Sequence, residues 1–253
     1  MLEYYKELNG SELMNIKDIN YLDYGVDKQG TIVLLHGWGQ NIEMMDMLGR
    51  PFSDKYRVIV LDLPGFGKSP EPSKPSSVSD YAKAVYTLLQ SLKVDNPILV
   101  GHSFGGRISI CYAAKYPTSK VVLLSAPFRP STQKSSNWRV KIFNFVKKFK
   151  ILKGLREYLR NKWGSEDYKN ASEINRGTLV KVVNEDLTKY AKTIKCPVLM
   201  IYGKEDTAVP IAEAYVLEKL IEDAGLVEYD NAHHYAYLER LNQTLAILNN
   251  FFE

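Results

Sequence analysis

Short runs of consecutive apolar residues recur along the chain, separated by longer segments of mixed character. The clearest runs cover residues 31–35, 58–61, 97–100, 121–124, 198–202 and 226–229. A strand inside a parallel sheet is covered on both faces, so its residues are apolar throughout instead of alternating with polar ones. The runs therefore predict the buried strands of one parallel sheet.

Helical patterns fill the spaces between these runs. The expected helices cover residues 78–92, 103–115, 211–224 and 238–252. Ser77 or Ser79 would cap the first of them. Residues 20–25 alternate in polarity, which indicates an additional antiparallel edge strand, and residues 69–79 are expected to form a loop. This order of elements predicts an α/β fold with a mostly parallel central sheet flanked by helices.

One long segment interrupts the alternation of strands and helices. Residues 127–195 contain no strand pattern, and residues 140–159 place apolar and basic residues at helical spacing. Such an insertion after a core strand indicates a helical cap over the strand ends. The predicted organisation is therefore a core of residues 1–126 and 196–253 with a cap of residues 127–195.

Charge is distributed unevenly between these two parts. The predicted cap holds 17 Lys and Arg against 6 Asp and Glu, an excess of 11 positive charges, so the rest of the chain carries −7 of the total of +4. The simpler interpretation is that the cap helices display lysine to solvent. The alternative is a surface that receives an anionic partner.

The overall composition is that of an ordinary globular protein, with 45% hydrophobic and 25% charged residues among 253. No apolar stretch is long enough to span a bilayer, and residues 1–7 lack the pattern of a secretory signal, so we expect a cytoplasmic protein. Cys111 falls within an expected helix and Cys196 just before a strand, which favours two small core residues over a disulfide or metal pair. No metal ion, cofactor or nucleic acid is expected.

A candidate nucleophile lies in the sequence Gly101-His102-Ser103-Phe104-Gly105, between an expected strand and an expected helix. A strand that turns sharply into a helix leaves little room for side chains, and the two glycines relieve that crowding. The start of the helix also directs free N–H groups toward the serine hydroxyl. This context predicts a nucleophile elbow with Ser103 at its tip.

A serine nucleophile requires a histidine to accept its proton. His233 and His234 follow the last expected strand, from which a base can reach back over the sheet. His36 and His102 are next to glycines in other motifs and are better explained as structural hydrogen bonders beneath the site.

The histidine in turn requires a carboxylate that orients it. Asp206 follows the expected strand 198–202, and open α/β sheets place their sites at such strand ends. Glu205 is the reserve choice. The plain alternative is that Asp206 only caps a turn or helix.

Attack by the serine also requires two donors for the oxyanion that forms. Trp38 follows the first long strand within Leu35-His36-Gly37-Trp38-Gly39, so its backbone N–H and that of Phe104 are the expected donors. Trp38 could instead serve only as a wall of an acyl pocket.

Several segments together resemble the α/β-hydrolase superfamily over about residues 21–252, apart from the cap. They are His36-Gly37-Trp38-Gly39, the stretch from Asp62 to Ser69, the pentapeptide from Gly101 to Gly105 followed by Gly106, residues 203–210, and Ala232-His233-His234 with Glu239. The resemblance implies a catalytic histidine five residues before a glutamate, which selects His234. His233, which replaces the usual glycine, is the reserve.

The resemblance also narrows the reaction. Haloalkane dehalogenases and epoxide hydrolases carry an aspartate at the elbow, unlike Ser103. The tryptophan of the HGWG segment is similar to that of the biotin-pathway carboxylesterases, which release a pimeloyl group carried as a methyl ester on acyl carrier protein. These features imply a serine hydrolase of carboxylic esters or thioesters, in which Ser103 forms an acyl-enzyme, His234 acts as base and then acid, and Asp206 orients His234. An acidic acyl carrier is then the candidate partner of the basic cap.

Two other functions are compatible with the same residues. A carbon–carbon bond hydrolase of this fold uses the same triad. Some relatives of the fold retain the triad but serve as ligand receptors or signalling partners.

Overall fold

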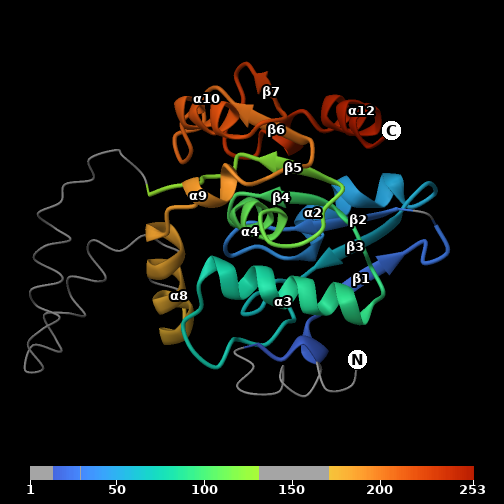
Figure 1. Cartoon of the computed structure of the whole chain (residues 1–253), viewed down its shortest axis with the longest axis vertical. Coiled ribbons are helices and arrows are strands. Elements are labelled where there is room, and N and C mark those ends of the chain that lie inside the picture. Colours follow the sequence, from blue (N-terminus) through green and yellow to red (C-terminus); the bar gives the residue numbers. More distant parts are fainter. Residues whose placement is uncertain (1–13, 29, 131–170) are drawn as a thin grey trace, which may run out of the picture.

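The computed structural model describes residues 14–28, 30–130 and 171–253. Its strands are β1 (Tyr21–Tyr24), β2 (Thr31–Leu35), β3 (Arg57–Leu61), β4 (Ile98–His102), β5 (Lys120–Leu124), β6 (Val198–Gly203) and β7 (Ala224–Tyr229). They form one seven-stranded sheet in the order β1-β3-β2-β4-β5-β6-β7, and the strands follow one another across the molecule in Figure 1. Only the β1–β3 pair is antiparallel among these strands, which confirms the predicted mostly parallel sheet and its edge strand.

Helices cover both faces of the sheet. They are α2 (Ile42–Gly49), α3 (Val78–Ser91), α4 (Phe104–Ala113), α8 (Glu173–Asn184), α9 (Thr188–Ala191), α10 (Ile211–Leu220), α11 (Ala236–Glu239) and α12 (Leu241–Phe252), with short 3-10 turns η1 (Ile16–Asp18) and η2 (Arg50–Phe52). Buried residues of α3, α4 and α10 belong to one hydrophobic cluster, and those of α2, α11 and α12 belong to another.

The central strands divide their residues between these two clusters. Val33 and Leu35 of β2 belong to the cluster with α3 and α4, whereas Ile32 and Leu34 belong to the cluster with α2 and α12. Successive side chains of a strand point to opposite faces, so a sheet covered on both faces needs apolar residues at every position. This double burial is the physical reason for the continuous apolar runs of the sequence.

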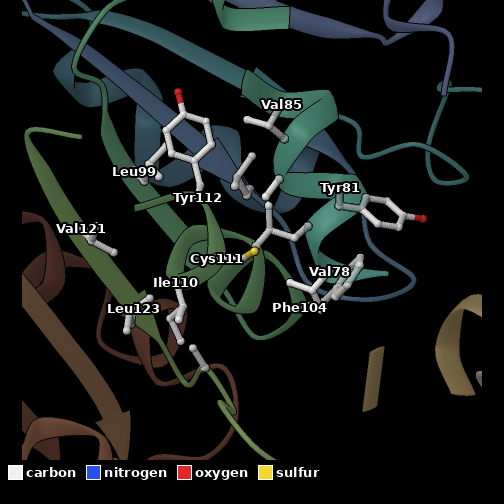
Figure 2. Packing of buried hydrophobic residues seen from close by; sticks show 14 of the residues in the cluster. Val78, Tyr81, Val85, Leu99, Phe104, Ile110, Cys111, Tyr112, Val121 and Leu123 are labelled. Atoms are coloured by element: carbon white, nitrogen blue, oxygen red, sulfur yellow. The ribbon is translucent and has the colours of Figure 1, made fainter. Parts of the chain in front are cut away.

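Aromatic and aliphatic side chains pack together on the face of the sheet that carries α3 and α4. Figure 2 shows Tyr81 of α3 and Phe104 of α4 close together, with Cys111 among aliphatic side chains. Cys111 is fully buried, and burial raises the pKa of its thiol, so it is a core residue as predicted. Cys196 is half-buried against the same cluster, and both cysteines are free.

Several element boundaries differ from those predicted, and three of these differences have a clear local cause. α10 ends at Leu220 because Ile221 is extended and the chain turns so that Ala224 pairs with Val198 of β6. The last predicted helix is two helices, since Arg240 leaves the helical conformation between α11 and α12. Ser103 is not part of the predicted helix 103–115, which begins at Phe104.

The predicted cap is described only at its two ends. Residues 131–170, which include all of 140–159, lie outside the described residues. At the junction with the core, the backbone N–H of Leu187 donates to the carbonyl of Phe128 at 2.8 Å. The buried guanidinium of Arg107 donates to the carbonyl of Pro127 at 3.2 Å and to that of Glu185 at 2.6 Å. One arginine of α4 therefore holds both the outgoing and the returning segment.

Candidate active site

Ser103 lies in the bend between β4 and α4, at the carboxyl edge of the sheet. Its φ is 49° and its ψ is −106°, in a region that L residues rarely occupy and that costs about 1–3 kcal/mol. The neighbouring strand β2 pairs with β4, with Leu35 opposite Gly101. Strand β3, which follows β2 in the sequence, lies on one side of β2, and β4, which comes next, lies on its other side. Ser103 is thus at the switch point of the sheet, where open α/β sheets bind ligands.

The two glycines of the pentapeptide permit this bend. A Cβ on Gly101 would come within 2.4 Å of the carbonyl oxygen of Gly105, and a Cβ on Gly105 within 2.1 Å of the carbonyl oxygen of Leu35. Backbone atoms cannot withdraw from such contacts as a flexible side chain can. The glycines therefore let α4 approach β2 and β4 closely enough to raise Ser103 at the turn.

His234 lies between Ser103 and Asp206. Its Nε2 is 3.1 Å from the Oγ of Ser103, and its Nδ1 is 2.8 Å from the Oδ2 of Asp206. A carboxylate can only accept, so Nδ1 carries the proton and Nε2 is left to accept the serine hydroxyl proton. The three side chains, which are far apart in the sequence, form one continuous chain of hydrogen bonds.

Asp206 is held as an anion. Its side chain is fully buried, and its Oδ1 accepts the backbone N–H groups of Ala208 at 2.8 Å and of Val209 at 2.9 Å. Burial favours the neutral acid, but the hydrogen bonds from His234 and from these two N–H groups outweigh it and lower the pKa of Asp206 below its usual value. Glu205, the reserve carboxylate, is exposed, and no side-chain contact joins it to His234 among the described residues.

His233, the reserve base, lies outside the series of hydrogen bonds that joins Ser103, His234 and Asp206. Its side chain is 68% exposed, and its Nδ1 is 3.3 Å from the Oε2 of Glu239. The other oxygen of Glu239 accepts the backbone N–H of His233 at 2.9 Å. Glu239 therefore braces the loop that carries both histidines, and it is His234 that the fold directs toward Ser103.

The backbone N–H groups of Trp38 and Phe104 have no hydrogen-bond acceptor within the described part of the chain. Phe104 is the first residue of α4, so its N–H has no partner in the helix. The Trp38 ring is half-buried and packs edge-on against Phe104, with ring centroids 5.3 Å apart, and against Phe66 at 4.8 Å. Trp38 thus lies beside the elbow with its ring against other aromatic side chains.

His36 and His102 have the structural positions expected for them. The Nε2 of His36 accepts the N–H of Leu63 at 2.9 Å while its Nδ1 donates to the carbonyl of Gly37 at 2.7 Å. Burial lowers the pKa of His36 to about 4 and that of His102 to about 3, so both rings are neutral. The hydrogen-bond partners found for the two rings in the described part of the chain do not include the Oγ of Ser103.

Sequence reasoning missed two polar contacts near the site. Asp62, within the motif from Asp62 to Ser69, is buried and accepts the backbone N–H groups of Ile42 at 2.8 Å and of Lys68 at 2.9 Å. Gln40 donates to the hydroxyl of Tyr235 at 2.6 Å and so joins the loop after β2 to the loop of His234. A short-range pattern could not reveal the contact of Asp62 with Ile42 or that of Gln40 with Tyr235, because the fold brings these partners together from distant parts of the sequence.

Comparisons with known proteins agree with this architecture. A family model described as the alpha/beta hydrolase fold matches residues 30–155. The chain is similar to the AB hydrolase superfamily protein YisY of Bacillus subtilis, with 28% identity over 87% of this chain and 91% of the relative. It is 24% identical to a pimeloyl-[acyl-carrier protein] methyl ester esterase of Pseudoalteromonas atlantica over 84% of this chain and 90% of the relative.

The fold also matches solved structures. An esterase from Exiguobacterium antarcticum superimposes with a TM-score of 0.73 at 23% identity, over 92% of this chain and 94% of the other. This likeness shows a common fold. The match to the family model shows that the chain belongs to the α/β-hydrolase superfamily. Its relatives include esterases and a lipase.

The described residues contain neither a group that could hold a metal ion nor a membrane-spanning helix. No group of three or more His, Cys, Asp or Glu side chains there could hold a metal ion. None of the helices in the described ranges is both long enough and apolar enough to cross a membrane.

Proposed function

We propose that this chain is a serine hydrolase that cleaves a carboxylic ester or thioester through an acyl-enzyme. The observation that carries the proposal is the hydrogen-bonded chain from the Oγ of Ser103 through His234 to Asp206, built on a strained turn at the switch point of the sheet. Ser103 is the nucleophile, His234 the base, and Asp206 the group that orients His234.

The proton follows the hydrogen bonds through the reaction. As the Oγ of Ser103 attacks the carbonyl carbon, its proton passes to Nε2 of His234, and the buried carboxylate of Asp206 stabilises the imidazolium. His234 then returns the proton to the leaving oxygen or sulfur as the acyl-enzyme forms. Water, deprotonated by the same nitrogen, attacks the acyl-enzyme and releases the acid and Ser103.

The unpaired N–H groups of Trp38 and Phe104 are the proposed oxyanion donors. They flank Ser103 from the loop after β2 and from the start of α4, so the developing negative charge would meet preorganised dipoles. Removing one such donor in comparable sites costs roughly two to three powers of ten in turnover.

A finer proposal concerns the segment of residues 127–195. We infer that it is a cap and that its excess of 11 positive charges receives an anionic acyl group or an acidic acyl carrier. Similarity to an esterase named for a pimeloyl group on acyl carrier protein supports this choice of partner. Most of the charges lie in residues 131–170, outside the described residues, so the proposal rests on the sequence.

A second candidate reaction is the hydrolysis of a carbon–carbon bond. It is supported by relatives named 2-hydroxy-6-oxononadienedioate/2-hydroxy-6-oxononatrienedioate hydrolase, at 25% identity. Cleavage of the substrate for which these relatives are named, without turnover of any ester, would favour this reaction over ester hydrolysis.

The decisive experiment compares the wild type with Ser103→Ala on p-nitrophenyl acetate and butyrate. We expect continuous turnover by the wild type, a loss of three or more powers of ten in the variant, and loss of covalent labelling by a fluorophosphonate. A single stoichiometric burst without turnover would indicate a receptor that retains the triad. Labelling that persists in Ser103→Ala would show that another serine reacts.

A further inference from the structure

His102 is the last residue of β4 and directly precedes Ser103. Its ring is 1% exposed and lies beneath three side chains of the loop that carries His234. The centroid of the His102 ring is 4.9 Å from the ring centroid of His234, 5.1 Å from that of Tyr235 and 4.9 Å from that of Tyr237. The histidine loop, defined here as residues 232–237, therefore rests on the ring of His102.

A directed hydrogen bond accompanies this packing. The Nε2 of His102 is 3.1 Å from the backbone carbonyl oxygen of His234. A carbonyl can only accept, so Nε2 carries the proton and Nδ1 is the unprotonated nitrogen of a neutral ring. The bond joins the strand that carries the nucleophile to the backbone of the residue that carries the base.

The other edge of the ring faces the loop after β2. A Cβ on Gly37 would lie 2.8 Å from Nδ1 of His102, and no hydrogen-bond partner of that nitrogen occurs among the described residues. Gly37 directly precedes Trp38, whose N–H is a proposed oxyanion donor. His102 is thus enclosed between the two loops that must be aligned on Ser103, and the Gln40–Tyr235 hydrogen bond joins the same two loops at the surface.

We propose that His102 is a positioning residue, which aligns two loops on Ser103. Its Nε2–H bond to the carbonyl of His234 holds the histidine loop, and its close approach to Gly37 holds the loop after β2, which carries Trp38. This role rests on the proposed function but adds a residue that takes no part in proton transfer. A displacement of about 1 Å in a reacting group can cost roughly a hundredfold in rate, so a modest shift of the His234 backbone is sufficient for a measurable effect.

The chain offers a matched pair of variants at this position. In His102→Gln the amide nitrogen can occupy the place of Nε2 and donate to the carbonyl of His234. In His102→Asn the amide is shorter and reaches only the place of Nδ1. The two variants have the same chemistry and differ in which ring nitrogen they replace, so a difference between them reports the hydrogen bond and not the loss of a buried histidine.

The test measures kcat and KM for p-nitrophenyl butyrate, the rate constant of fluorophosphonate labelling, and the folded fraction of each variant from its unfolding curve. We expect His102→Asn to lower kcat and the labelling rate about 10–100-fold with KM nearly unchanged, and His102→Gln to recover most of the loss. Nitrogen NMR of the wild type should report a neutral ring at His102 protonated at Nε2.

Three outcomes would overturn the proposal. They are equal losses in the Asn and Gln variants, a loss no larger than the drop in folded fraction, and a ring protonated at Nδ1. Labelling by the fluorophosphonate needs no knowledge of the natural substrate, so it reports the alignment of Ser103 even if every ester tried is poor. Failure of the proposed function has a different signature, namely that Ser103→Ala and the wild type label and turn over alike.

Discussion

At the scale of single residues, His233 and His234 are neighbours in the sequence but differ in surroundings. The His233 ring is mostly exposed beside Glu239, whereas His234 lies between the buried Asp206 and Ser103. The difference arises because the histidine loop is braced on both sides, by Glu239 outside and by the core beneath. Position in the fold, and not residue type, separates the two.

This difference predicts unequal effects of two alanine substitutions. His234→Ala should lower kcat/KM for a model ester nearly as much as Ser103→Ala, because members of a triad act as a unit and their losses do not add. His233→Ala should change it by only a few-fold, since the hydrogen-bond partner of that ring within the described ranges is the exposed Glu239. Steady-state kinetics of the variants, including the double variant Ser103→Ala with His234→Ala, measure the ranking. If His233→Ala proved the more damaging, the base would be His233.

At the scale of elements, Ser77 and not Ser79 caps the N-terminus of α3. The backbone N–H of Asp80 donates to the Oγ of Ser77, and the Asp80 carboxylate accepts the N–H of Ser77 at 2.8 Å, which is a reciprocal capping box. The hydroxyl of Ser79 instead accepts a hydrogen bond from Lys115 of the region after α4. The sequence allowed either serine, and the structure selects Ser77.

Ser77→Ala should therefore lower the free energy of unfolding by about 1 kcal/mol, the usual effect of losing a helix cap. Ser79→Ala is the matched control and should change it by less than about 0.5 kcal/mol, as for other surface positions. Urea unfolding of the two variants under identical conditions compares them. Equal losses would mean that the capping box contributes nothing beyond the removal of a hydroxyl.

At the scale of the whole molecule, two buried neutral histidines make stability depend on pH. The folded pKa is lowered to about 4 for His36 and about 3 for His102, below the ordinary value of about 6.5 in an unfolded chain. The unfolded state therefore binds more protons as the pH falls. Their contribution to stability is intact above about pH 6.5 and is lost progressively as the pH falls from there through the folded values.

His36→Gln keeps an acceptor for the N–H of Leu63 but cannot be protonated. The variant should be less stable at pH 7.5 yet lose less on acidification, with the slope near pH 5 reduced by up to about 1.4 kcal/mol per pH unit. Urea midpoints from pH 7.5 to 4.5 provide the slopes. Parallel curves for the wild type and His36→Gln would contradict the assignment of a buried neutral ring.

Charge asymmetry predicts a salt effect on catalysis at the same scale. If the basic segment steers an anionic or carrier-linked ester, its kcat/KM should fall as salt rises, because fields are screened over about 10 Å at 0.1 M. A small neutral ester should show no such dependence. Reversal of Lys147, Lys148 and Lys150 to glutamate, at positions outside the described residues, should reproduce the loss for the anionic ester alone. Equal salt profiles for both esters would mean that these lysines do not steer the substrate.

Much of the fold could be predicted from local pattern. Buried parallel strands must be apolar at every position, so the apolar runs coincide with β2 to β7 within a few residues, and the alternation at β1 identified an antiparallel edge. Helix α2 is not predicted by the sequence pattern, although Asn41 caps it and Ile42, Met45 and Leu48 are buried at a spacing of three. That pattern is too short to be distinguished from a loop without its packing partners.

The sequence by itself determined the elbow, because only glycine at 101 and 105 permits the backbone contacts that lift Ser103, and it placed the candidate partners at the ends of particular strands. It did not settle whether Asp206 or Glu205 is the carboxylate beside the histidine. It also did not settle which of His233 and His234 faces Ser103. Tertiary structure decided which side chains meet, since a hydrogen bond of 2.8 Å between residues 206 and 234 depends on how β6 and the histidine loop are packed. The same holds for His102, whose bond to the carbonyl of His234 joins residues that no local pattern relates, because distance along the chain and distance in space are set by different interactions.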